Sequence, residues 1–343
     1  MNAENRLSGV DTLRTIAIWI MIVANSSPYA LGAEPNAAFR MLCSMAAPLF
    51  VSLSGYALYI SQKKHGRPNY SNGLYILVSA ILVDVCSWGI WPLHTFDVLY
   101  LIGIAWLLNS FLYPKSMLVK WSVLVSIGLI SILLHQTFSY RFENTDLSLK
   151  TIHDWHFNWI AWQRLLLDGW FPLFPWLMLS VLGLILAQWS DQQTSFKPIR
   201  FYSSSLVFIA LFIWHSIQTT TAPLREGYIE LFYPLSPVFL VCVVALMLMS
   251  NDIIHWFKQQ HWQWARFNMI GQHSLFVYML HTLIISKLIS PYAGELNPPA
   301  FGLLMLVFIG SMYAVVYAKS TLESKGLFKA WPKPLLKCLG LKA

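Results

Sequence analysis

The chain has 343 residues, of which 57% are hydrophobic and 11% are charged, and its formal net charge is +8. Soluble domains carry roughly 25% charged residues, so this composition excludes a soluble globular protein. The class it predicts is an all-α, polytopic membrane protein, because only helices and closed barrels satisfy the backbone inside a bilayer.

We expect one transmembrane domain over residues 1–343, built from about ten membrane-spanning helices. The longest hydrophilic stretch is an outer loop at 136–171, and a basic tail follows at 320–343. The expected spans are 12–31, 38–61, 73–93, 97–113, 117–135, 172–189, 203–220, 232–250, 269–289 and 299–319.

The positive charge is concentrated on one side of this predicted topology. With the N-terminus inside, 17 of the 23 Lys and Arg residues fall on the inner side. Cytoplasmic loops of membrane proteins carry such an excess, so we expect both termini to be cytoplasmic and the membrane to be a bacterial inner membrane. The charge is then explained by topology, and we expect no nucleic-acid partner.

Three polar residues mark the first span. Asp11 and Arg14 stand at its start, where no signal-peptide cleavage site follows, and Asn25 lies deeper. Eleven residues separate Arg14 from Asn25, which is about 16 Å and three helical turns, so both look out from nearly one face. Asp11 joins that face. Polar groups inside a membrane helix are costly, so each requires an explanation.

The span at 269–289 carries a second polar face. Ser274, Tyr278 and His281 follow one another at i, i+4 and i+7. His281 falls near the middle of the bilayer, where a histidine is either a hydrogen-bonded structural group or a proton-transfer group. His273 lies at the cytoplasmic end of the same helix and is expected to be exposed.

Two acidic residues lie in or beside the predicted spans. Asp84 is in the third span, where we expect a salt bridge or a hydrogen bond to a neighbouring helix. Asp97 follows His94 by three residues at an outer turn. These two could form a base with its orienting partner, or a solvated turn in which Asp97 caps the next helix.

The sequence lacks the motifs of soluble enzymes and of metal sites. It has no P-loop, GxSxG, HExxH or paired CxxC pattern, so any chemistry must come from polar groups inside the bundle. The cysteines share no metal-ligand spacing, and we expect no metal; those in apolar runs are expected to be small core residues. The four cysteines are Cys43, Cys86, Cys242 and Cys338, and three of them lie in apolar runs.

Five segments, taken together, resemble the transmembrane acyltransferase superfamily. The first helix resembles its R-x-x-x-x-D-x-x-R-G pattern, and the last segment its G-x-x-S-L-x-x-Y-x-x-H pattern. The most similar branch is the heparan-alpha-glucosaminide N-acetyltransferase-like catalytic domain. The segments are Arg6 to Asn25, Ala47 to Tyr56, Phe96 to Gly103, Phe171 to Gly183 and Ile270 to His281.

This resemblance implies a membrane acyltransferase, which takes acetyl from cytoplasmic acetyl-CoA and delivers it to a sugar or glycan outside, as in polysaccharide modification. Asn25 matches an amide near the acyl site of the branch, and His281 matches the histidine that ends the last motif. Asp11 and Arg14 match the entrance pair. We expect this entrance, together with three basic residues of the loop after the second span, to attract the phosphates of coenzyme A. These three residues are Lys63, Lys64 and Arg67.

The chain also departs from the branch. The loop after Asn25 lacks the histidine that the branch carries there, so His281, His94 or another group must replace that base. Asp97 and Tyr100 replace a glycine and a histidine of the third segment. The acceptor, the use of a direct or an acyl-enzyme route, and the oligomeric state, with a homodimer as one option, are left open.

An alternative function is a transporter or flippase of a glycan, lipid or small solute. It would explain the polar groups inside the membrane and a possible repeat, since 171–175 (FPLFP) and 233–237 (YPLSP) both open spans that enter from outside. Helix capping by proline explains the same pattern. The outer loop is open to two interpretations: an interfacial amphipathic helix or a lid over an outward-facing site.

Overall fold

A computed structural model describes residues 8–32, 36–93, 96–138, 162–192, 196–218, 237–259, 266–329 and 331–341. Within these ranges the regular structure is helical, and the single extended pairing is an isolated bridge between Leu31 and Leu296. That bridge ties the loop after the first helix to the loop before the last long helix, through Gly32 N to Leu296 O at 2.9 Å.

Helices form at every stretch for which the sequence predicts a span. In chain order they are α1 Ser8–Ala30, α2 Ala37–Ser44, α3 Ala46–His65, α4 Ser71–Leu82, η2 Val83–Trp88, α5 Val98–Leu112, α6 Met117–Thr137, η5 Arg164–Asp168, α8 Leu173–Asp191, α9 Pro198–Gln218, α10 Pro237–Gln259, α11 Met269–Gln272, α12 Ser274–Ile284, η7 Ile285–Ile289, α13 Ser290–Tyr292, α14 Pro298–Ser324 and α15 Lys333–Cys338. Of the described helices, seven are long and apolar enough to cross a membrane, and two apolar helices are shorter. The protein is an integral membrane protein; the count of ten spans stays a prediction.

Capping residues place the helix ends. Asp97, Ser116 and Asn297 are N-caps whose side chains accept hydrogen bonds from backbone N–H groups at the starts of α5, α6 and α14. Gly66, with φ of 67°, ends α3 in the left-handed region that glycine adopts without strain. These signals are local, but the predicted spans differ from the helices at several ends: α3 continues to His65 beyond the predicted 61, and α10 to Gln259 beyond 250.

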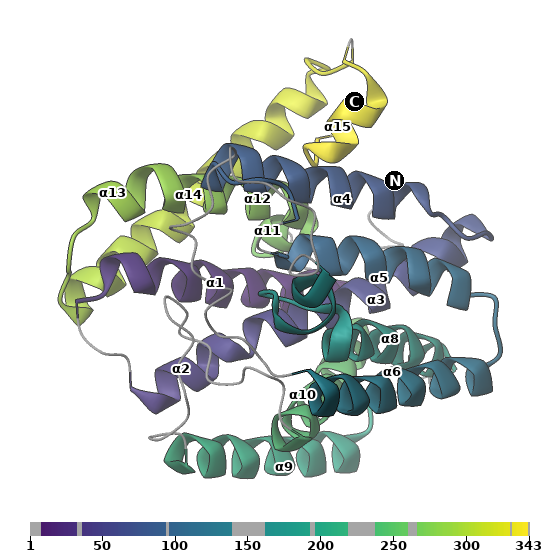
Figure 1. The fold of residues 1–343 in the computed structure, drawn as a ribbon. Helices are drawn as coiled ribbons and strands as arrows, with labels where there is room; N and C mark the ends of the chain where they lie inside the picture. Colours follow the sequence, from purple (N-terminus) through teal and green to yellow (C-terminus); the bar gives the residue numbers. More distant parts are fainter. Residues whose placement is uncertain are drawn as a thin grey trace.

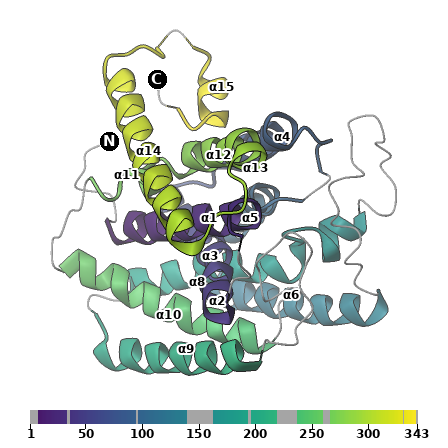
Figure 2. The ribbon, with the colours of Figure 1, turned by 90° about the vertical axis from the view of Figure 1, so that its left-hand side faces the viewer.

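The bundle is built around α1 and α3. Both run through its middle, with α4, α12, α14 and α15 on one side and α9 and α10 on the other (Figure 1, Figure 2). In the apolar window of Ala37–His65, 89% of residues are buried, against 17% in Met117–Thr137. The α3 span is therefore packed by protein on all sides, whereas α6 presents most of its surface outward, as a lipid-facing helix does.

Helices α3 and α8 approach so closely that their backbones touch. A Cβ atom at Gly55 would lie 2.0 Å from Ser180 O, and one at Gly183 would lie 2.0 Å from Ser52 O. Small residues permit such approaches between membrane helices, where dispersion contacts drive association. This crossing sets the position of the central helix against the rest of the bundle.

The structure corrects the prediction for His273, which is buried rather than exposed. The helical path breaks between α11 and α12 at this residue, and α14 covers the break. Lys319 Nζ donates to His273 Nδ1 at 2.8 Å and to Glu323 Oε1 at 2.8 Å. A buried cation needs such partners.

The four cysteines are all free, and burial of Cys43 and Cys242 confirms the expectation for cysteines in apolar runs, whereas Cys338, in the basic tail, is buried as well. The exception is Cys86, which is exposed on η2. Cys338 lies in α15, which folds back onto α4 so that Ser79 Oγ donates to Cys338 O at 2.6 Å. Among the described residues no group of metal-ligating side chains is found.

Candidate functional site

Four polar residues from three separate elements meet inside the bundle, and we call them the interior cluster: Asn25, Asp97, Tyr278 and His281. Asn25 lies near the end of α1, Tyr278 and His281 lie on α12, and Asp97 caps α5. His281 is fully buried, with 0% of its surface exposed, and Asp97 and Tyr278 are 3% exposed. The sequence prediction that His281 faces the protein interior is confirmed.

The hydrogen bonds of His281 define which ring nitrogen carries the proton. Nδ1 lies 3.1 Å from the carbonyl oxygen of Val277, which can only accept, so Nδ1 is the protonated nitrogen. Nε2 lies 3.3 Å from Asn25 Nδ2, which donates to it. In this tautomer the single lone pair of Nε2 faces α1 and accepts from Asn25.

Asp97 caps α5, as one of the two sequence alternatives predicts, but it is buried rather than solvated and its second partner is Tyr278. Its Oδ1 accepts from Val98 N at 2.6 Å, which caps α5, and each of its carboxylate oxygens lies 2.7 Å from the hydroxyl of Tyr278. The Tyr278 ring in turn packs edge-on against His281, with ring centroids 5.0 Å apart. Asp97 thus fixes the position of the Tyr278 hydroxyl by hydrogen bonding, and the Tyr278 ring packs against the imidazole of His281.

Asp84 belongs to a separate structural pair. Tyr100 donates to Asp84 Oδ2 at 2.7 Å and accepts from Leu93 N at 3.1 Å. This confirms the prediction of a hydrogen bond to a neighbouring helix, and it explains why a carboxylate is tolerated within η2.

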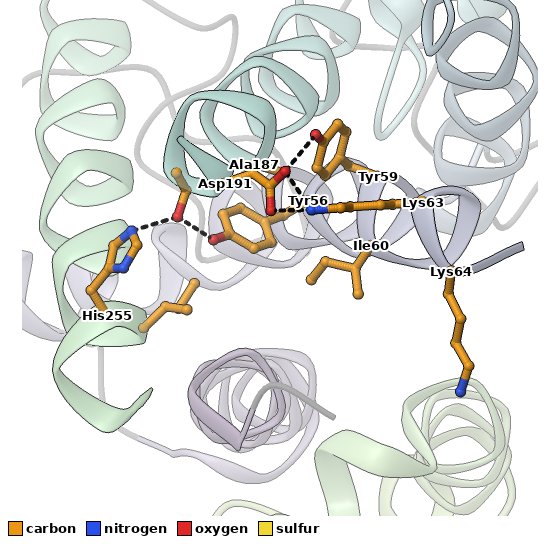
Figure 3. A pocket seen from close by; sticks show the side chains of 10 residues that line it. Tyr56, Tyr59, Ile60, Lys63, Lys64, Ala187, Asp191 and His255 are labelled. Carbon is orange, nitrogen blue, oxygen red and sulfur yellow. Dashed lines mark hydrogen bonds and ion pairs between the residues drawn. The ribbon is translucent and has the colours of Figure 1, made fainter. Parts of the chain in front are cut away.

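A cavity of about 410 Å³ lies at the ends of α3, α8 and α10. Lys63 reaches Asp191 at 2.5 Å, and Tyr59 donates to the same carboxylate at 3.2 Å. Lys64 points to the other side of the helix, away from Asp191 (Figure 3). The lining residues are Tyr56, Tyr59, Ile60, Lys63, Lys64, Ala187, Ser190, Asp191, Ile254 and His255.

The inner wall of this cavity is a chain of hydroxyl and imidazole groups. Tyr56 donates to Ser190 Oγ at 2.8 Å, and Ser190 Oγ lies 2.6 Å from His255 Nε2 (Figure 3). These contacts join α3, α8 and α10 at one end of the bundle. Nothing in the sequence distinguishes these residues from ordinary core positions, because only the packing of three distant helices brings them together.

The interior cluster and the cavity lie at opposite ends of α3. Phe50, near its start, stacks on Tyr278 with ring centroids 6.5 Å apart. Lys63 stands 13 residues later, which is about 20 Å along a helix. One continuous helix thus connects a cationic, aromatic cavity with the buried imidazole.

The other predicted site residues lie elsewhere. Asp11 is buried in the first turn of α1 against Gly271, and Arg14 is half-buried one turn on; neither lines the cavity. Thr15, which stands where the superfamily pattern has glycine, accepts from Gly271 N at 3.0 Å and so ties α1 to α11. Arg67 is exposed beyond α3 and does not line the cavity.

Some predicted features fall outside the described residues. They include His94, most of the outer loop at 136–171, and most of the second proline-containing segment at 233–237. Neither the His94–Asp97 pair nor the possible repeat can therefore be compared with the structure, and both stay predictions.

Taken together, the apolar helices and the interior cluster define an integral membrane protein with a buried cluster of hydrogen-bonded polar side chains. The family described as "Heparan-alpha-glucosaminide N-acetyltransferase, catalytic" matches residues 6–213, which is more than half of the chain. The chain belongs to this family, as the resemblance of its motifs predicts, and the family implies membrane acetyltransferase activity. No curated protein matches the chain closely enough to be compared with it.

Proposed function

We propose that this protein transfers an acetyl group from cytoplasmic acetyl-CoA to a hydroxyl or amine of a sugar on the outer side of the membrane. The observation that carries the proposal is the unprotonated Nε2 of His281, fully buried and facing Asn25. A base in a water-poor interior is suited to acyl transfer, in which hydrolysis must be avoided.

Each residue of the interior cluster has a role in this proposal. When the acceptor enters, the Asn25 amide leaves Nε2, whose single lone pair then takes the proton of the acceptor hydroxyl or amine as that group attacks the acyl carbon. The C–S bond of the thioester breaks, and the coenzyme A sulfur takes this proton and leaves as the thiol. Asn25 Nδ2, which already donates to this site, stabilises the negative charge that develops on the acyl oxygen. Tyr278 and Asp97 are positioning residues, since they contact each other and the imidazole ring.

The cavity suits the nucleotide end of coenzyme A. Its lining combines Lys64, which attracts phosphates, and Lys63, which is paired with Asp191, with tyrosine rings on which a base can stack. With the predicted topology, the cavity opens to the cytoplasm, because α3, α8 and α10 all end there. Coenzyme A supplies the activated acetyl group as a thioester, and the length of α3 separates its phosphates from the interior cluster.

Replacing Lys64 with glutamate should weaken coenzyme A binding about tenfold, because it puts a negative charge where we place a phosphate. Lys64 is exposed and faces away from Asp191, so the change breaks no ion pair with any residue that the structure describes. Isothermal titration calorimetry of purified protein in detergent measures the dissociation constant.

Lys115→Glu is a matched control for this experiment. Lys115 is exposed, lies over the Phe111 ring and does not line the cavity. Equal weakening by both substitutions would show a general charge effect and would contradict the cavity assignment.

Incubation with radiolabelled acetyl-CoA and a panel of glycans tests the function itself. Asn25→Ala should lower the transfer rate by about 10²–10³, the usual effect of removing one oxyanion donor. Ser27→Ala serves as the control on the same helix, because the Ser27 hydroxyl bonds only Ala24 O in its own helix at 2.8 Å.

Two outcomes would contradict the proposal. Transfer that is unchanged in Asn25→Ala would remove the assigned role of the amide. Solute or lipid flux in reconstituted vesicles without coenzyme A, with no acetyl transfer, would instead support the transporter alternative.

A further inference from the structure

Three buried polar side chains lie one helical turn inward from residues that line the cavity. On α10, Ser250 and Asn251 precede Ile254 and His255 by four residues, and on α3, Ser52 precedes Tyr56 by four. Their exposed fractions are 3%, 1% and 1%. Residues four apart share a helix face, so these groups lie about 6 Å deeper than the cavity wall.

None of these three side chains has a hydrogen-bond partner among the described residues. The unpartnered atoms are Ser52 Oγ, Ser250 Oγ and both Asn251 Oδ1 and Nδ2. Among the other buried serines, Ser54 and Ser131 bond to a carbonyl of their own helix, whereas Ser26 Oγ on α1 is also without a partner among the described residues. Buried polar atoms without partners are rare and costly, so a group of them needs an explanation.

The position of these side chains suggests what they bind. Phe50, two residues before Ser52, stacks on Tyr278 of the interior cluster. Along α3, Ser52 therefore lies between the cavity residue Tyr56 and the ring that contacts the cluster. Helix α10 packs against α1, α3 and α8, and Ile254 touches Gly9 of α1. Ser52 thus lies along α3 between the proposed nucleotide end and the interior cluster, and Ser250 and Asn251 lie one turn inward from the cavity on α10, which packs against α3.

We propose that Ser52, Ser250 and Asn251 bind the pantetheine arm of the acyl donor; this inference rests on the proposed function. The arm carries two secondary amides, each with one donor and one acceptor, on an otherwise apolar chain. Asn251 offers both a donor and an acceptor, and each serine hydroxyl can act as either. The unpartnered donors and acceptors therefore match those of the two pantetheine amides.

Asn251→Leu tests the proposal with two readouts other than activity. In the ligand-free protein the change removes an unpartnered amide, so the melting temperature should stay the same or rise. The dissociation constant of coenzyme A should increase about tenfold, since the hydrogen bonds to the arm are lost. The dissociation constant of the adenosine bisphosphate part of coenzyme A, which lacks the arm, should not change.

Asn109→Leu is the matched control. Asn109 is also a fully buried asparagine, but its Nδ2 donates to Ser180 Oγ at 2.8 Å and joins α5 to α8. This variant should lower the melting temperature and leave the coenzyme A dissociation constant unchanged. Ser250→Ala, a smaller change, should weaken coenzyme A binding about threefold in a protein of wild-type stability.

The outcomes separate this inference from the function on which it rests. If wild-type protein does not bind coenzyme A, the proposed function itself is wrong. If the wild type binds, but Asn251→Leu and Ser250→Ala bind equally well, the pantetheine assignment is overturned and the groups hold ordered water. A fall in melting temperature as large as that of Asn109→Leu would likewise overturn it, because it would show that Asn251 has a structural partner.

Discussion

Replacing His281 with glutamine is expected to lower the rate of acetyl transfer by about 10²–10⁴, the contribution of a well-placed general base. Glutamine is similar in size and can still hydrogen-bond to Asn25, but its amide cannot accept a proton. Coenzyme A binding should be unchanged, because the cavity lies at the other end of α3. Single-turnover transfer from labelled acetyl-CoA, beside calorimetric binding, separates the two effects.

His273→Gln is the control for this prediction. His273 is also buried, but it bonds Lys319 and Ser320 away from the interior cluster. Its replacement should change thermal stability only modestly, since the glutamine amide oxygen can still accept from Lys319 and Glu323 remains its partner, while the rate per folded molecule should be retained. A rate loss for His273→Gln as large as that for His281→Gln would contradict the assignment of the base.

Gly55→Ala is expected to prevent correct packing of the bundle. The added Cβ would lie 2.0 Å from Ser180 O and 2.9 Å from Ser180 C, both backbone atoms that cannot rotate away. Helices α3 and α8 would have to separate, and α3 is the most buried span. We expect a loss of more than ~3 kcal/mol in stability, which exceeds the usual effect of overpacking because backbone meets backbone.

Gly302→Ala provides the comparison for Gly55→Ala. A Cβ at Gly302 of α14 would meet no atom within 4 Å, so alanine should be tolerated and should gain up to about 1 kcal/mol from its higher helix propensity. Thermal unfolding in detergent, followed by circular dichroism, measures both variants. Equal melting temperatures would mean that α3 and α8 do not cross at this point.

Residues whose roles depend on a local signal were predictable. The N-cap role of Asp97, the inward-facing His281 and the helix at each predicted span follow from hydropathy, helical period and capping chemistry within a few turns of chain. His273 shows the limit of such signals. Its position at a helix end indicates exposure. It is buried because α14 covers it, through Lys319, which stands 46 residues later in the chain.

The interior cluster and the cavity also differ in how far the sequence predicts them. The sequence marks Asn25 and His281 as costly polar groups in apolar helices, but it cannot show that they meet, 256 residues apart in the chain. It gives no sign of Ser190, His255 or Asn251, because serine, histidine and asparagine near helix ends are ordinary.

The amino-acid sequence by itself determined the membrane class, the helices and the family motifs, because apolar runs, charge and spacing are properties of the local chain. Only the tertiary structure decided which polar groups share a site and which stay without partners. The reason is that burial and hydrogen bonding in a helix bundle depend on which helices cross, and close crossings such as Gly55 against Ser180 join segments far apart in the chain.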